Sequence, residues 1–300
     1  MGPLTLWWRP WDDHDAHMES TYGERGRPES GNDLVRAIAN GELELHYQPI
    51  LDLTNRYLTG FEALLRWQHP TKGLLGPYRI IPLAEECGLI QEVDDWVLNE
   101  AAARLAAWQD DVLVGDGFRV HVNVSGMELD DRTLVDRVRR SVARTRVIPS
   151  GLTIEVTETR LIEDVASAKR AIDALHEMGV ELALDDFGTE YATFMRLHAL
   201  HFDIVKIDKG FVAACDTDLG RTFIRAFVDL ANGLGAGIIA EGIETTDQLA
   251  KVIDAGCHQG QGFLWSPAIP VADAEHLLLT GELPEEDPVT QRRTRLPFAS

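Results

Sequence analysis

Cysteine is scarce in this 300-residue chain, and its spacing limits the chemistry that sulfur could supply. The three cysteines, Cys87, Cys215 and Cys257, are odd in number and lie far apart. This pattern argues against a disulfide framework and is typical of a protein in a reducing cytoplasm. No Cys-x-x-Cys pair is present, so we expect no zinc site built on thiolates.

Long apolar runs and a surplus of positive charge are missing as well. No stretch of 18 apolar residues occurs, and the first residues lack the pattern of a secretory signal, so we expect no membrane span and a cytoplasmic protein. The chain has 28 Lys and Arg against 49 Asp and Glu, a net charge of −21. We therefore expect no general nucleic-acid binding through a basic surface. An anionic substrate would need local cations at its site, either bound metal or a few placed Lys or Arg side chains.

The chain divides into two tails and one domain. Residues 1–30 are polar and lack a sustained period, so they are expected to form a poorly ordered N-terminal tail or linker. Residues 284–300 read as a C-terminal tail, which leaves 31–283 for the folded domain.

Within the domain, short apolar segments alternate with helical ones. The expected strands are 43–50, 57–66, 118–124, 152–157, 180–185, 203–207, 236–241 and 257–264. The expected helices are 82–108, opening at Pro82, then 131–146, 164–178, 190–199, 217–234, 245–255 and 271–279. Eight strands alternating with helices predict an α/β fold, with a (β/α)8 TIM-like barrel as first choice. A doubly wound open sheet is the alternative, but it would want a glycine-rich loop after the first strand, and none is there.

One expected strand carries two charges on a single face. At period two, Glu62, Leu64 and Arg66 point the same way. Burying a lone carboxylate or guanidinium is costly, so each needs a partner. The two could pair with each other, or a metal could neutralise the glutamate and an anionic ligand the arginine.

Polar side chains also mark the carboxyl ends of the other strands, which is the end where barrel enzymes carry their chemistry. Taken singly, each position could be a helix cap or part of a salt bridge. Taken together, they supply oxygen donors of the kind that Mg²⁺ or Mn²⁺ prefers. The donors are Glu62, Asn123, Glu155, Asp185, Asp186 and Glu241. So many carboxylates in one pocket predict a metal ion or a metal pair, with Lys206 and Gln261 at the same rim.

The motifs along the domain resemble those of one family. They include HYQPI at 46–50, EALLRW at 62–67, VNVS at 122–125, IEVTE at 154–158, LDDFGT at 184–189, VKID at 205–208, AEGIET at 240–245 and QGFLWSP at 261–267. In this order they resemble the EAL-domain cyclic di-GMP phosphodiesterases. The resemblance implies a barrel with one early strand antiparallel, and hydrolysis of cyclic di-GMP to linear pGpG by a metal-bound water.

The resemblance also implies roles for individual residues. One metal would be held by Glu62, Asn123, Glu155 and Asp185, and a second by Asp185, Asp186 and Glu241. The catalytic set would be Lys206, which orients the water, with Glu241 and Glu62. Substrate contacts would come from Gln48, Leu64, Arg66, Glu244 and Gln261. Glu158 would anchor the loop after the fifth strand, and the family's coupling of that loop to dimerisation implies a homodimer.

One departure from the family pattern keeps an alternative open. The loop after the fifth strand reads DDFGTEYAT, with Glu190 where the family has a second glycine. The alternative is a catalytically weak or inactive module that binds cyclic di-GMP or a protein partner as a sensor. A barrel glycosidase that uses two carboxylates is a third, unrelated hypothesis.

Overall fold

A computed structural model describes residues 30–124, 132–157, 165–188 and 200–283 of the chain. The expected helix at 190–199, the expected tail 1–30 except for its last residue, and the tail 284–300 lie outside these ranges, as do Glu158 and Glu190. Among the described residues, no helix combines the length and apolarity needed to cross a bilayer.

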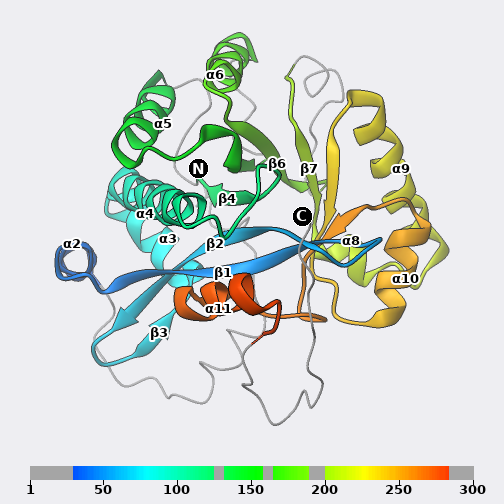
Figure 1. The fold of residues 1–300 in the computed structure, drawn as a ribbon, viewed down its shortest axis with the longest axis horizontal. Helices are drawn as coiled ribbons and strands as arrows, with labels where there is room; N and C mark the ends of the chain where they lie inside the picture. The colour runs from blue at the N-terminus through cyan, green and yellow to red at the C-terminus, as the bar shows by residue number, and fades with distance from the viewer. Residues whose placement is uncertain (1–29, 125–131, 158–164, 189–199, 284–300) are drawn as a thin grey trace, which may run out of the picture.

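Eight strands close into a barrel (Figure 1). They are β1 (Leu43–Asp52), β2 (Leu58–His69), β4 (Arg119–Asn123), β5 (Leu152–Thr157), β6 (Glu181–Phe187), β7 (Ile204–Ile207), β8 (Gly237–Ala240) and β9 (Gln259–Gly260). Two short strands, β3 (Gly73–Leu75) and β10 (Ile269–Pro270), extend the sheet beside β2 and β1. The expected barrel is confirmed, and each of the eight expected strands overlaps an observed one.

The direction of β1 sets this barrel apart from an all-parallel one. β1 runs antiparallel to both of its barrel neighbours, β2 and β9, whereas the other neighbouring strands pair in parallel. The β1–β2 register is long, from Leu43 opposite Trp67 to Leu51 opposite Leu58. The β1–β9 register pairs Leu51 with Gly260 and Asp52 with Gln259. The antiparallel early strand implied by the family resemblance is therefore present. It closes the barrel by pairing with β2 on one side and with β9 on the other.

Helices pack around the barrel, with α4, α5 and α6 on one side in Figure 1 and α9 and α10 on the other. The described helices are α2 (Gly31–Asn40), α3 (Pro77–Glu86), α4 (Ile90–Asp110), α5 (Arg132–Thr145), α6 (Val165–Glu177), α8 (Lys209–Ala213), α9 (Asp218–Leu234), α10 (Thr246–Asp254) and α11 (Val271–Thr280). Amphipathic sequences dictate their packing; in α9, for example, Ile224, Val228 and Ala231 are buried at helical spacing.

The expected single helix at 82–108 is wrong in its start and its continuity. The chain forms α3 from Pro77, which suits the first helical turn because proline has no N–H to leave unbonded. Pro82 lies inside that helix rather than at its start. Gly88 then takes a left-handed backbone, φ 69°, which ends α3 before α4 begins at Ile90. In the second part, α4 presents an apolar stripe to the core that includes the buried residues Val93 and Leu105.

Strand alternation separates an outer apolar layer from the barrel interior. On β6, β7 and β8, Leu182, Val205 and Ile238 belong to the large core. Their neighbours belong to a second, small apolar cluster, which consists of Ile50, Ala183, Ile204 and Ile239. Because alternate residues of a strand share a face, the residues two positions after Ala183, Ile204 and Ile239 point to the same side. Those residues are Asp185, Lys206 and Glu241. The small apolar cluster therefore lies next to them on the same face of the strands, one inward-facing position closer to the amino-terminal ends of β6, β7 and β8.

Candidate metal centre

Lys206 lies at the centre of a group of carboxylates inside the barrel, and its side chain has no solvent exposure. Its ammonium nitrogen, Nζ, is 2.7 Å from Glu241, 2.8 Å from Glu155, 3.3 Å from Glu62 and 3.4 Å from Asp185. The four acids come from β2, β5, β6 and the residue that follows β8. The barrel therefore brings together the strand-end residues that the sequence pattern picked out.

Two amide side chains donate hydrogen bonds to the acids, and one of them links two acids. Asn123 Nδ2 donates to Glu62 Oε1 at 2.8 Å. Gln261 Nε2 donates to Glu62 Oε2 at 2.5 Å and to Glu241 Oε1 at 3.1 Å. Gln261 is held in place because the next residue, Gly262, abuts the backbone of Ile243, where a β-carbon would come within 2.2 Å.

The paired aspartates depend on an irregularity in β6. The β6–β7 register pairs Leu184 with Val205 and then Phe187 with Ile207, so Asp185 and Asp186 together face Lys206 alone. Asp186 has a left-handed backbone, φ 54°, a conformation that aspartate tolerates better than most residues. In a regular strand, two consecutive side chains would point to opposite faces. This bulge instead lets both carboxylates approach the same space.

The donor set fits a divalent cation. One oxygen from each of Asp185, Asp186 and Glu241 lies within 4.8 Å of the others. Both carboxylate oxygens of Asp185 are buried and accept no hydrogen bond, which is costly for a polar group without a further partner. An all-oxygen set of this kind suits Mg²⁺ or Mn²⁺. Asp185, Asp186 and Glu241 are thus placed to hold one ion.

Without a bound cation, the burial of so many carboxylates in one group is electrostatically unfavourable. Burial raises the pKa of Asp185 and of Glu241 well above the ordinary value, even though Lys206 opposes the shift. Burial likewise raises the pKa of Glu155 to about 8 and that of Asp186 to about 6. For Lys206, burial works against the charge, but the surrounding carboxylates outweigh it and raise the pKa. In this cage the surrounding carboxylates therefore favour the charged form of Lys206.

The cation beside Glu62 is Lys206. Burial raises the pKa of Glu62, but the charge of Lys206 and hydrogen bonds from Gln261 and Asn123 outweigh it, so the pKa falls below its ordinary value. Arg66 lies four residues further along β2, about 13 Å away at the usual rise per residue of a strand. The guanidinium is buried and donates to the Leu65 carbonyl at 3.0 Å. Of the two hypotheses for this strand, a direct Glu62–Arg66 pair does not describe the structure.

The remaining expected contact residues lie around the cluster rather than in it. Gln48 on β1 is opposite Glu62 in the antiparallel register, so their side chains share a face. Leu64 and Arg66 follow on that face of β2. Glu244 is exposed in the loop before α10, where the Gln248 side chain accepts from its backbone N–H.

One polar neighbour of the cluster was not singled out as a site residue from the sequence. His121 is buried on β4, and its Nδ1 is 2.8 Å from Glu155 Oε1. The signal was available, because His121 has the same parity as Asn123 and so faces the barrel interior. Its role depends on a neighbouring strand, which the sequence alone does not align.

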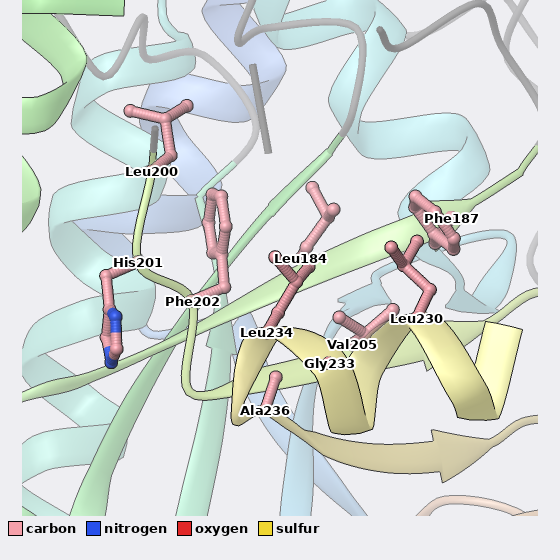
Figure 2. Close-up of a pocket in the computed structure, with 10 residues that line it drawn as sticks. All are labelled: Leu184, Phe187, Leu200, His201, Phe202, Val205, Leu230, Gly233, Leu234 and Ala236. Carbon is pink, nitrogen blue, oxygen red and sulfur yellow. The ribbon is translucent and has the colours of Figure 1, made fainter. Parts of the chain in front are cut away.

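A separate cavity of about 140 Å³ lies between α9 and the β6–β7 region (Figure 2). Apart from His201, its lining side chains are apolar, and they include Leu184, Phe202, Val205 and Leu230. None of the candidate metal ligands lines it, so it is not part of the carboxylate site.

Comparison with known proteins places the chain in a family. A family model described as the EAL domain matches residues 31–268. A protein of Pseudomonas aeruginosa named cyclic di-GMP phosphodiesterase NbdA is 38% identical over 250 residues, which are 82% of this chain and 31% of NbdA. MucR of the same species, named a bifunctional diguanylate cyclase/cyclic di-GMP phosphodiesterase, is 38% identical over 249 residues, 82% of this chain and 36% of MucR.

Comparison with solved structures points to the same family. The structure described as the PaMucR phosphodiesterase in a c-di-GMP complex superposes with a TM-score of 0.76 at 36% identity, covering 81% of this chain and 98% of that one. The chain spans 30% to 40% of the length of curated relatives such as a signaling protein of Caulobacter vibrioides and Rv1354c of Mycobacterium tuberculosis. The match over residues 31–268 and the shared barrel establish that the chain belongs to the EAL domain family.

Proposed function

We propose that this barrel is a cyclic di-GMP phosphodiesterase that hydrolyses one phosphodiester bond of its substrate to give linear pGpG. One water is consumed, one P–O bond forms and one P–O bond breaks. NbdA and MucR carry this activity in their names, which supports the same substrate class here.

The observation that carries the proposal is the buried Asp185 carboxylate, whose two oxygens accept no hydrogen bond within a group of acids. We assign Glu62, Asn123, Glu155 and Asp185 to one Mg²⁺ or Mn²⁺ ion and Asp185, Asp186 and Glu241 to a second. When bound, two such ions acidify a water and clamp the phosphoryl group. The chain contributes the oxygen ligands and holds them in fixed positions.

Lys206 places a positive charge in the site that comes from the protein itself and not from a metal ion. As an ammonium, it can only donate hydrogen bonds, and it donates one to Glu155 at 2.8 Å. We therefore assign it to orient the attacking water and to stabilise charge that develops in the transition state.

Substrate binding is assigned to the face that Gln48 shares with Glu62. Leu64 and Arg66 on β2 continue this face, and Arg66 offers the fork that suits a phosphate. Glu244 and Gln261 would flank the substrate from the loops after β8 and β9. In this chain Gln261 already bonds Glu62 and Glu241, so it links the substrate side to the metal side.

Further parts of the proposal concern the chain around the site. We place the phosphodiesterase domain at residues 31–283 between two tails, and we propose a cytoplasmic homodimer in which Glu158 anchors the loop after β6. The conventional test of the assembly is molar mass by light scattering, where a monomer at working concentrations would contradict it.

The activity is tested by incubating the chain with cyclic di-GMP and Mg²⁺ or Mn²⁺ and separating pGpG from GMP and GTP. We expect pGpG as the product, and no reaction from Glu62→Gln, whose uncharged side chain keeps the size of glutamate. Tight binding of cyclic di-GMP with no pGpG would instead support a sensor.

The metal requirement has its own test. Turnover should stop in EDTA and return with Mg²⁺ or Mn²⁺. Ca²⁺ should bind the same acids yet support little turnover, because it prefers longer bonds and looser coordination. Full activity in EDTA would contradict a metal site.

A further inference from the structure

Glu155 has a nitrogen partner at each of its two carboxylate oxygens. Lys206 Nζ donates to Oε2 at 2.8 Å, and His121 Nδ1 is 2.8 Å from Oε1. The glutamate side chain has no solvent exposure. Each of its oxygens therefore has a short contact with a nitrogen atom, whereas the oxygens of Asp185 accept no hydrogen bond.

We propose that His121 is a positioning residue that sets the orientation of Glu155 for metal binding. A carboxylate accepts hydrogen bonds, so we assign the imidazole proton to Nδ1, which donates to Glu155 Oε1. A hydrogen bond to the far oxygen of a carboxylate fixes its rotation about the last side-chain bond. This inference refines the metal site of the proposed function and does not depend on the hydrolysis of any particular substrate.

The strand register explains why His121 can reach Glu155. The Cα of His121 is opposite Thr153 on β5, and Asn123 is opposite Glu155. His121 thus lies one inward-facing position closer to the amino-terminal end of the barrel, so its ring approaches Glu155 from beneath. Asn123, two residues later, points into the same interior and bonds Glu62.

His121 borders a polar cavity of about 220 Å³ at that end of the barrel. His121 lines it together with Arg119, Glu181 and Gln259. Arg119 is held by Glu181 through two hydrogen bonds of 2.8 Å each, and Gln259 donates to Thr59 at 3.2 Å. These groups already have partners among themselves, which leaves His121 as the cavity residue that contacts the carboxylate cluster.

The experiment compares two substitutions that differ mainly in one donor. His121→Asn and His121→Leu have similar size and branching, but only asparagine can donate from a position close to that of Nδ1. Thr153→Val is the control for disturbance of the barrel interior, because the Thr153 hydroxyl is buried beside His121 in register and has no hydrogen-bond partner.

Mn²⁺ affinity, measured by calorimetry on the full chain without substrate, is the readout. We expect His121→Leu to weaken Mn²⁺ binding by roughly 10-fold or more, as removal of outer-shell partners does elsewhere. We expect His121→Asn to recover most of the loss and Thr153→Val to bind as the parent does. Circular dichroism and thermal unfolding in EDTA confirm that each variant is folded, and His121→Phe replaces His121→Leu if the latter does not fold.

The outcomes separate this inference from the proposed activity. Parental Mn²⁺ affinity in His121→Leu, or equal weakness in His121→Asn and His121→Leu, would overturn the positioning role even if the parent makes pGpG. A parent that binds no Mn²⁺ would overturn it as well. Loss in His121→Leu with recovery in His121→Asn would support it even if no cyclic di-GMP is hydrolysed.

Discussion

The ammonium of Lys206 lies 2.7 Å from Glu241 Oε1, inside the barrel and away from solvent. The contact joins β7 to the residue that follows β8. It gives a net acidic chain a buried positive charge at the place where its acids converge. We therefore expect the stability of the metal-free barrel and the proposed chemistry of the site to depend on the same side chain.

Lys206→Met should abolish turnover and destabilise the metal-free protein. The substitution keeps an unbranched chain but leaves several buried carboxylates without their cation, and breaking a buried pair in this way costs about 3–5 kcal/mol. Urea unfolding in EDTA measures the stability, and pGpG formation measures the activity. Lys251→Met is the matched control, since Lys251 pairs with Asp216 and Asp247 on the surface. Parental turnover by Lys206→Met would remove Lys206 from the mechanism.

Asp185→Asn should have the opposite effect on metal-free stability. Removing one of several buried carboxylates relieves repulsion, so the melting temperature in EDTA should rise by a few degrees, about 2–4 °C per kcal/mol for a domain of this size. The same variant should lose the stabilisation that Mg²⁺ gives the parent. Differential scanning fluorimetry with and without Mg²⁺ measures both effects. Asp173→Asn, an exposed aspartate on α6, should change neither, and an undiminished Mg²⁺ shift in Asp185→Asn would contradict its place in the cage.

The thiols should differ sharply in reactivity. Burial raises the pKa of Cys257 to about 12, so almost none of it is thiolate at pH 8, and Cys215 is buried too. Cys87 is exposed beside the end of α3. Iodoacetamide at pH 8 should therefore modify Cys87 in the native protein, with all three cysteines modified in guanidinium. Mass spectrometry of tryptic peptides reads the sites, and rapid native labelling of Cys257 would show that its burial is wrong.

Val112→Gly should stabilise the protein. Val112 follows α4 with a left-handed backbone, φ 56°, and its side chain is largely exposed. A β-branched residue is strained there, while glycine is not, so we expect a gain of about 1 kcal/mol. Val112→Ala keeps the β-carbon and should gain less, which separates backbone strain from the loss of an exposed apolar group. Equal effects of the two substitutions on urea unfolding would contradict the backbone explanation.

Strand alternation in the sequence predicted the barrel and its inward-facing residues because the side-chain period of a strand is local. The break between α3 and α4 was missed, since it depends on the left-handed backbone of Gly88 and on Pro82 being tolerated within a helix. Both are decided by how the helices pack on the barrel. The helical spacing of apolar residues that include Val93 and Leu105 continues beyond the break, so the sequence pattern did not reveal where one helix ends and the next begins.

Similar limits apply to the site. The identities of the acids could be predicted from strand ends, but the bulge at Asp186 depends on the register between β6 and β7. The contact of His121 with Glu155 depends on the register between β4 and β5. Such relations join residues far apart in the chain, so local patterns indicate which side chains face inward without showing which ones meet.

The short β1–β9 pairing has a consequence for local opening of the barrel. Only two residues of each strand, Leu51 with Gly260 and Asp52 with Gln259, are paired there, and the next residue after β9 is Gln261. Gln261 reaches past β1 to bond Glu62 on β2 at 2.5 Å. A fluctuation that separates β1 from β9 therefore also withdraws Gln261 from the carboxylates, so slow hydrogen exchange at the amide of Gly260, the partner of Leu51, should mark a closed barrel and an assembled site at once.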